Sequence, residues 1–226
     1  MVPRMIIGCG TGRCGTWTLS KIFGIQKDVA AKHEGVSFPW ERDDNVFYNR
    51  MLRLWINIDS PIIASVSWVW INYIGTIMGN LKNPRCVCLK RNRGEVIKSF
   101  LAHSPFINHW TDPKSLHWDP NKDVCTALAH QWPKHDLPKK EAIGAYWDEY
   151  YAHAEYLQLR YPDNFAIFSL HEALNTEFGQ RRMLSFAGIK VEDQVIALNQ
   201  KLNSLHKPKG EIKEATDVYP RQSISK

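Results

Sequence analysis

A cluster of glycines with one arginine lies near the N-terminus and has the composition of an anion-binding loop. The stretch Gly8-Cys-Gly-Thr-Gly-Arg-Cys-Gly15 holds four glycines and Arg13. Glycine lets the backbone adopt positive φ and come close to an anion, and the free N–H groups at the start of a following helix point to the same place. Ile6 and Ile7 precede the stretch and helix-compatible residues follow it from Thr16, which predicts a strand, a phosphate-sized loop and a helix.

Two known nucleotide-binding patterns share this outline and differ in their letters. A Walker loop requires Gly-x-x-x-x-Gly-Lys-Ser/Thr, but here Thr16 replaces the lysine and Trp17 replaces the magnesium-binding hydroxyl, which argues against phosphoryl transfer. The dinucleotide fingerprint is matched literally by Gly10-Thr-Gly-Arg-Cys-Gly15. Glu34 follows about 20 residues later, where the ribose-binding acid would stand. A nicotinamide-dependent oxidoreductase is therefore one alternative.

A second segment that could bind phosphate follows Pro84. The apolar run Cys86–Leu89 predicts a strand, and the residues after it predict a helix. Arg91 stands at the end of this strand, and Ser99 lies eight residues further along the chain. An arginine at a strand end and a hydroxyl about two turns into the next helix can converge on one phosphate, because arginine supplies a planar fork of donors and serine a compact one.

Taken together, the two segments resemble sulfotransferases that use 3′-phosphoadenosine 5′-phosphosulfate. The 5′-phosphosulfate loop of that family is similar to Gly12-Arg-Cys-Gly-Thr-Trp-Thr-Leu19, and its 3′-phosphate segment is similar to Arg91-Asn92 followed by Ser99-Phe100. The resemblance implies a P-loop-like fold, this nucleotide as co-substrate without a metal, and a small-molecule or glycan hydroxyl or amine as acceptor. The nucleotide-binding residues that it implies are Gly12, Arg13, Cys14, Gly15, Thr16, Trp17, Arg91 and Ser99.

In-line transfer of the sulfuryl group is the mechanism that this resemblance implies. The backbone N–H groups of residues 12–17, the Thr16 hydroxyl and Arg13 would neutralise charge on the leaving phosphate oxygen. Some family members use a histidine on the third strand as general base, but the comparable place here reads Ala64-Ser-Val-Ser67. Others use a glutamate after the second strand, where His33 and Glu34 stand. We expect Glu34 to be the base, with His33 as the alternate or as its partner.

Two further segments are expected to border the site. Residues 103–137 are rich in histidine, tryptophan and proline, which predicts an irregular lid or acceptor wall. No histidine pair there has the spacing of metal ligands, so we expect no metal. Residues 206–226 form a polar tail, and Lys209 within it resembles loosely the basic segment that closes the nucleotide pocket in the family.

Strands that alternate with helices predict an α/β fold, as a three-layer sandwich around a central parallel sheet. The length suits a single domain over 1–226. Amphipathic helices are expected over 41–58 and 139–161, a strand over 165–169 and a last helix over 195–205. Ser60 to Leu81 contains no charged residue, and its proline, asparagines and glycines favour a buried strand and helix over a membrane span.

Composition narrows the classes of partner and compartment. The net charge of +6 and the isoelectric point near 9.0 favour anionic ligands, but the charge is spread along the chain and no nucleic-acid motif accompanies it. The five cysteines are odd in number, and Cys86 and Cys88 alternate along a predicted strand as core residues. With no signal-peptide pattern, these features predict a cytoplasmic protein. A binding module that has lost catalysis is a further alternative.

Overall fold

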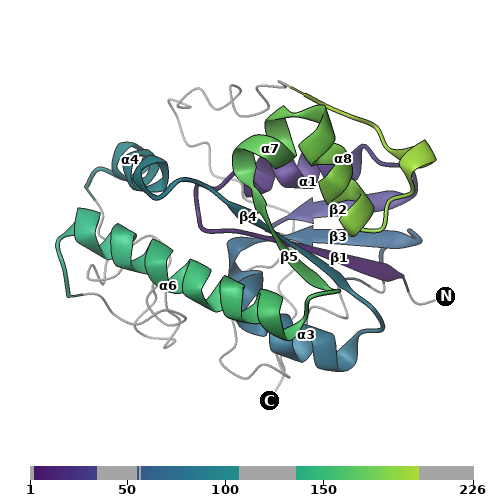
Figure 1. Cartoon of the computed structure of the whole chain (residues 1–226), viewed down its shortest axis with the longest axis horizontal. Helices are drawn as coiled ribbons and strands as arrows, with labels where there is room; N and C mark the ends of the chain where they lie inside the picture. Colours follow the sequence, from purple (N-terminus) through teal and green to yellow (C-terminus); the bar gives the residue numbers. More distant parts are fainter. Residues whose placement is uncertain (1–2, 35–54, 56, 107–135, 199–226) are drawn as a thin grey trace, which may run out of the picture.

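A central parallel sheet organises the computed structural model, which describes residues 3–34, 55, 57–106 and 136–198 (Figure 1). In this part of the chain the strand order is β2-β3-β1-β4-β5, and each neighbouring pair is parallel. The strands are β1 (Arg4–Cys9), β2 (Val29–His33), β3 (Ile62–Val66), β4 (Arg85–Lys90) and β5 (Phe165–Ser169). The α/β class with a parallel central sheet is therefore confirmed.

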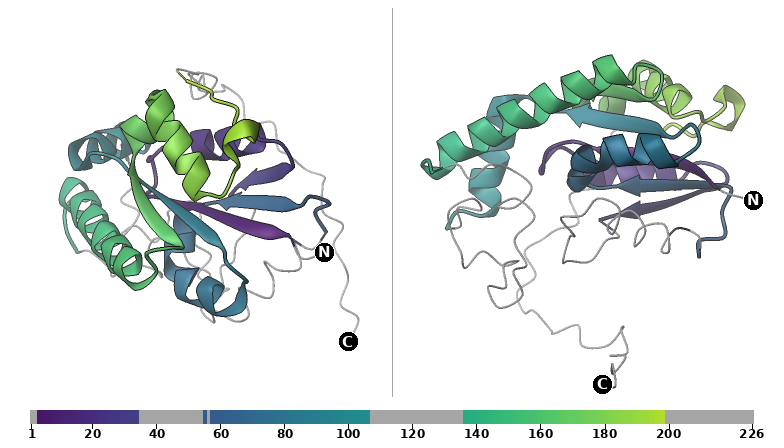
Figure 2. Two further views of the ribbon diagram at one scale, coloured as in Figure 1. Left: turned by 45° about the vertical axis from the view of Figure 1, so that its right-hand side comes forward. Right: turned by 90° about the horizontal axis from the view of Figure 1, so that it is seen from below.

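Helices cover both faces of the sheet and make three layers. The helices are α1 (Thr16–Gly24), η1 (Trp68–Tyr73, 3-10), α3 (Ile74–Asn80), α4 (Arg93–His103), α6 (Lys139–Arg160), α7 (Leu170–Asn175), α8 (Glu177–Phe186) and η3 (Val191–Asp193, 3-10). Successive strand residues point to opposite faces, so Ile6 packs with α1, α7 and α8, whereas Ile7 packs with η1, α3 and α6. Figure 2 shows α6 across the sheet from α7 and α8. Cys86 and Cys88 are buried in the second of these cores, as expected.

The charge-free stretch from Ser60 to Leu81 folds as β3, η1 and α3. Its strand matches the prediction, but the expected single helix is divided into two short ones. Ser67 begins the first of them, and its side chain accepts a hydrogen bond from the Val69 N–H. Among the described helices, none combines the length and the apolar character that crossing a membrane requires.

The prediction of a helix from Val195 is wrong over residues 195–198, which are not helical. The backbone of residues 194–198 is irregular, because two glutamine side chains bind it from other elements. Gln26 accepts from the Val195 N–H at 2.9 Å, and buried Gln180 accepts from the Ala197 N–H at 2.7 Å. Each side-chain amide also donates to the carbonyl of the same residue, as a neighbouring strand would. Residues 199–205 lie outside the described residues.

The other predicted segments are covered only in part. The helix over 139–161 is α6, and the strand over 165–169 is β5. Of the helix expected over 41–58, residues 41–54 and 56 lie outside the described residues, whereas Trp55 is buried with its ring centroid 5.5 Å from that of Trp70. The irregular region expected over 103–137 begins later than predicted, because His103 is the last residue of α4; residues 107–135 lie outside the description.

Candidate active site

The glycine-rich loop joins β1 to α1 and takes three residues with positive φ. They are Gly10 at 147°, Arg13 at 66° and Gly15 at 75°. A Cβ at position 10 would lie 2.7 Å from the Leu89 carbonyl oxygen, so this glycine is required by its conformation and by its contact with β4. Arg13 is the unusual member, because a residue with a side chain rarely adopts this conformation.

Two tyrosines of α6 form hydrogen bonds with the backbone of the glycine-rich loop. The hydroxyl of Tyr150 accepts a hydrogen bond from the Gly10 N–H at 2.9 Å, and that of Tyr146 accepts from the Gly12 N–H at 3.1 Å. The Cys14 N–H donates to the carbonyl of Thr11 at 3.1 Å. Two of the loop N–H groups expected to bind phosphate, those of Gly12 and Cys14, are thus already used within the protein.

Three further N–H groups of the expected set lie at the start of α1. Within the part of the chain that the structure describes, the N–H groups of Gly15, Thr16 and Trp17 make no hydrogen bond. They belong to the first turn of a helix, where the positive end of the helix dipole adds to their attraction for an anion. This turn is the part of the loop that is equipped to bind a phosphate.

Cys14 anchors the loop with its side chain. The thiol is buried, donates to the Leu89 carbonyl at 3.1 Å and lies 3.3 Å from the Tyr151 hydroxyl. Burial raises the pKa of Cys14 to about 11, so the group remains a neutral thiol at physiological pH. The side chain therefore faces the core, and only the backbone of this residue lies in the loop.

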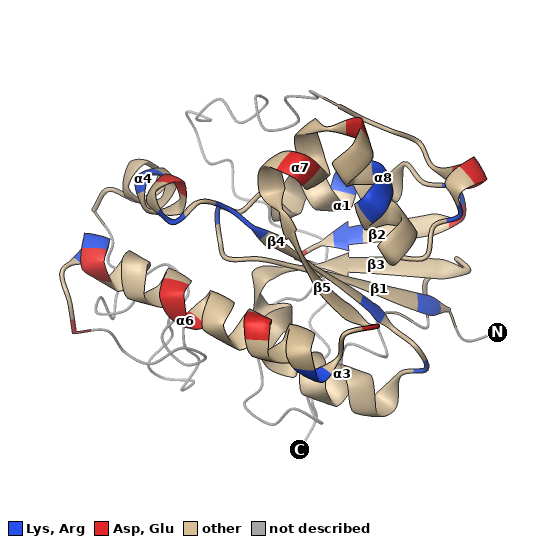
Figure 3. Ribbon diagram, viewed as in Figure 1, with Lys and Arg blue, Asp and Glu red and all other residues tan. Residues whose placement is uncertain are grey.

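The two predicted phosphate segments are in direct contact. Arg13 Nε donates to Ser99 Oγ at 3.2 Å, although the two residues lie 86 positions apart, and Arg91 Nη1 donates to the Arg13 carbonyl at 3.0 Å. Partial burial, and after it the charge of Arg91, lowers the pKa of Arg13. Two guanidinium groups held this close create a local positive potential that an anionic ligand would relieve. Figure 3 shows Lys and Arg at the β4–α4 junction and acidic residues along α6.

Glu95 and Trp147 also contact the arginine segment, and the motif comparison did not identify them. Glu95 accepts from Arg91 Nε at 2.9 Å, and Trp147 Nε1 donates to the Arg91 carbonyl at 2.9 Å. The four-residue spacing of Arg91 and Glu95 across the start of α4 was the signal available for the first contact. No comparable signal existed for Trp147, which lies 56 positions away.

At the carboxyl end of β2, His33 rather than Glu34 touches the loop. His33 Nε2 lies 3.0 Å from Thr16 Oγ1, and Glu34 Oε1 lies 3.9 Å from the same nitrogen. Burial lowers the pKa of His33 and outweighs the opposite effect of Glu34, so the imidazole is neutral near pH 7 and able to accept a proton. The Glu34 carboxylate is about half exposed, with 51% of its side chain accessible.

Other expected features of the site fall outside this contact network. Lys209 and most of the histidine-rich segment lie outside the described residues. Within the described ranges, no three His, Cys, Asp or Glu side chains come together in a way that could hold a metal ion.

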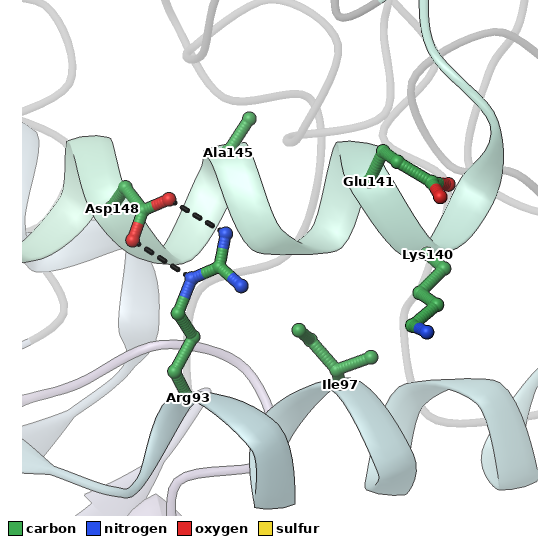
Figure 4. Close-up of a pocket in the computed structure, with 6 residues that line it drawn as sticks. All are labelled: Arg93, Ile97, Lys140, Glu141, Ala145 and Asp148. Atoms are coloured by element: carbon green, nitrogen blue, oxygen red, sulfur yellow. Dashed lines mark hydrogen bonds and ion pairs between the residues drawn. The ribbon is translucent and has the colours of Figure 1, made fainter.

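A separate recess of about 250 Å³ lies between α4 and α6 (Figure 4). Arg93 makes two hydrogen bonds to Asp148 at one end of the recess, at 2.9 and 2.8 Å. Its lining contains none of the predicted site residues.

Comparison with known proteins gives a distant structural likeness. No protein-family model and no curated protein sequence matches this chain. Among solved structures, a sulfotransferase from Alicyclobacillus acidocaldarius is similar, with 14% sequence identity and a TM-score of 0.49 over 88% of this chain and 87% of the other.

Proposed function

We propose that the protein is a sulfotransferase that moves a sulfuryl group from 3′-phosphoadenosine 5′-phosphosulfate to a hydroxyl or amine acceptor. The observation that carries the proposal is the contact between the two phosphate-binding segments. Arg13 of the loop reaches Ser99 of α4, and Arg91 reaches the backbone of Arg13. Two segments with separate phosphate-binding motifs therefore lie side by side, which supports the binding of one nucleotide through two phosphates.

In this proposal, each phosphate of the nucleotide is bound by a different set of donors. The N–H groups of Gly15, Thr16 and Trp17, together with Arg13, hold the 5′-phosphate, whereas Arg91 and Ser99 hold the 3′-phosphate. During transfer the bond from sulfur to the bridging phosphate oxygen breaks, and a bond from sulfur to the acceptor atom forms. The preorganised donors at the loop stabilise the charge that the leaving phosphate oxygen acquires.

The proton of the acceptor needs a base, and His33 has the better support. Its neutral imidazole lies against the loop, next to the Thr16 hydroxyl. When that hydroxyl turns to donate to a bound 5′-phosphate, His33 Nε2 becomes able to accept the acceptor's proton. The described contacts connect the Glu34 carboxylate to the loop through His33, whose Nε2 lies 3.9 Å from Oε1. Its position in the sequence made Glu34 the expected base. We prefer His33 because its imidazole contacts the Thr16 hydroxyl directly.

The nicotinamide alternative fits the sheet less well. In the dinucleotide-binding order 3-2-1-4-5-6, the second strand lies next to the first, which brings the acid at its end to the ribose. Here β3 lies between β1 and β2, so Glu34 follows a strand one position further from the loop. A binding module without catalysis would have the same contacts, and turnover with an acceptor separates it from the enzyme.

Calorimetric titration with adenosine 3′,5′-bisphosphate and adenosine 5′-monophosphate tests the proposal. We expect the bisphosphate to bind, and Arg91→Ala to weaken its binding about 10- to 100-fold, as the loss of a charge-assisted hydrogen bond does. Binding of the monophosphate should change much less.

Arg181→Ala is the matched control, because Arg181 is also paired with a glutamate four residues away but lies on α8. If Arg91→Ala weakened binding of both nucleotides equally, the assignment of Arg91 to the 3′-phosphate would be wrong. Absence of bisphosphate binding in the wild-type protein would overturn the proposed function itself.

A further inference from the structure

One turn of α6 touches both phosphate-binding segments. Tyr146 binds the Gly12 N–H of the loop, and its neighbour Trp147 donates to the Arg91 carbonyl at the β4–α4 junction. One turn later, the Tyr150 hydroxyl accepts from the Gly10 N–H. Adjacent residues of α6 therefore form hydrogen bonds with both segments that carry the proposed phosphate donors.

The contacts lie in rigid, closely packed surroundings. Tyr146 and Tyr150 are fully buried, with ring centroids 5.9 Å apart and nearly perpendicular planes. Tyr146 also packs edge-on against Phe100, the neighbour of Ser99, at 6.3 Å. A Cβ at Gly12 would lie 2.7 Å from the Phe100 ring, so loop, α4 and α6 are close-packed at this point.

Packing alone does not account for the polar atoms of these side chains. Phenylalanine at position 146 would fill nearly the same volume without a hydroxyl, and tryptophan at 147 could face the core without its N–H reaching a carbonyl. Burial raises the pKa of Tyr146 well beyond its ordinary value, so its hydroxyl remains neutral and continues to accept from Gly12. The hydrogen bond fixes the peptide between Thr11 and Gly12, one residue before Arg13.

We propose that α6 sets the spacing between the 5′- and 3′-phosphate subsites, with Tyr146 and Trp147 as positioning residues that make the site selective for nucleotides carrying both phosphates. The proposal rests on the proposed function. A ligand that engages both subsites gains from the second phosphate only if the subsites are held at the matching distance, because the second contact is then made at high effective concentration. Loosening one anchor reduces that gain without removing any group that touches the ligand.

The test compares Tyr146→Phe and Trp147→Phe with the wild-type protein in titrations with adenosine 3′,5′-bisphosphate, 5′-monophosphate and 3′-monophosphate. The measured quantity is the ratio of monophosphate to bisphosphate dissociation constants. We expect this ratio to fall about tenfold in each variant, the effect of one hydrogen bond, with each monophosphate bound nearly as before. Tyr156→Phe is the matched control, because Tyr156 lies half-exposed on the same helix, and its ratio should not change.

A second measurement does not depend on nucleotide binding. Hydrogen exchange of the Gly12 amide should accelerate in Tyr146→Phe and remain unchanged in Tyr156→Phe, since only the first substitution removes its acceptor. Equal weakening of monophosphates and bisphosphate, an unchanged ratio, or unchanged exchange at Gly12 would overturn the role of α6 while leaving the proposed function in place. A wild-type protein that binds no bisphosphate would overturn both.

Discussion

Arg13 combines an unfavourable backbone conformation with the central contact of the site. A non-glycine residue at φ 66° costs about 1 to 3 kcal/mol, and such strain persists only where neighbouring contacts enforce it. Here the Gly12 and Cys14 N–H groups on either side are both hydrogen-bonded, and Arg91 donates to the Arg13 carbonyl. This arrangement directs the guanidinium to Ser99, at the place that we propose for the phosphates of the nucleotide.

At the same residue scale, His33 should control the pH dependence of the reaction. Its lowered pKa means that the neutral form persists to lower pH in the folded protein than in the unfolded chain, whose histidine titrates near 6.5. We expect kcat, measured with any acceptor that the wild-type protein uses, to fall as the pH drops through the His33 pKa. His33→Gln should lower kcat by about 10² to 10⁴, the usual contribution of a general base.

The matched variants for this prediction are Glu34→Gln and His153→Gln. Burial also lowers the pKa of His153, which lies on α6 away from the contacts of the loop, so its substitution should leave kcat unchanged. For both histidines the unfolded state binds more protons below about pH 6.5, and their contribution to stability therefore decreases as the pH falls through that value. A larger loss of kcat in Glu34→Gln than in His33→Gln would assign the base to Glu34.

At the scale of elements, the corner between α7 and α8 depends on a glycine inside a helix. A Cβ at Gly179 would lie 2.2 Å from the Glu172 carbonyl oxygen, a backbone atom that cannot move aside easily. The Gly179 N–H also donates a capping hydrogen bond to Thr176 Oγ1 at 3.0 Å. Close approach of the two helices, rather than helix propensity, therefore explains this glycine.

Gly179→Ala should destabilise the protein by about 1 to 3 kcal/mol, because overpacking outweighs the gain in helix propensity. Gly75→Ala provides the contrast, because Gly75 lies in α3 with no atom within 4 Å of the added Cβ. There we expect a gain of about 0.5 to 1 kcal/mol. Urea unfolding of both variants measures the two changes, and a stabilising Gly179→Ala would contradict the predicted close approach.

For the molecule as a whole, the parallel sheet brings distant segments to one edge. The loop after β1, Arg91 after β4 and His33 at the end of β2 all stand at carboxyl ends of parallel strands. Strands of an open α/β sheet leave their carboxyl ends along one edge, where ligands bind. The candidate site therefore follows from topology as much as from any one motif.

The segment after η3 is joined to the rest of the molecule through two glutamines. Gln180→Ala would leave the buried N–H and carbonyl of Ala197 without their partner, so we expect a loss of about 1 to 3 kcal/mol in the free energy of unfolding. Arg181→Ala, next to it but exposed, should change stability by less than about 1 kcal/mol. Equal stability of the two variants in thermal unfolding would show that this attachment contributes little.

The sequence by itself determined the parts of the protein whose residues lie close together in the chain. The strand, glycine loop and helix around Arg13, and the eight-residue spacing of Arg91 and Ser99, could be predicted because local hydrogen bonding and side-chain periodicity depend on neighbouring residues. The α/β class followed from the alternation of such segments. Tyr146 has no predicted role beyond its place in the amphipathic helix expected over 139–161.

The tertiary structure alone decided which of these parts meet. The hydroxyl of Tyr146 accepts from the N–H of Gly12, 134 positions away in the sequence. Gln180 binds the backbone of Ala197, where the sequence predicts a helix. His33, rather than Glu34, contacts Thr16: His33 is the last residue of β2, whereas Glu34 lies just past the strand in a left-handed backbone conformation at φ 47°. Hydropathy patterns distinguish buried from exposed positions, but they do not specify the partner of a buried polar atom, since that partner comes from a distant part of the chain.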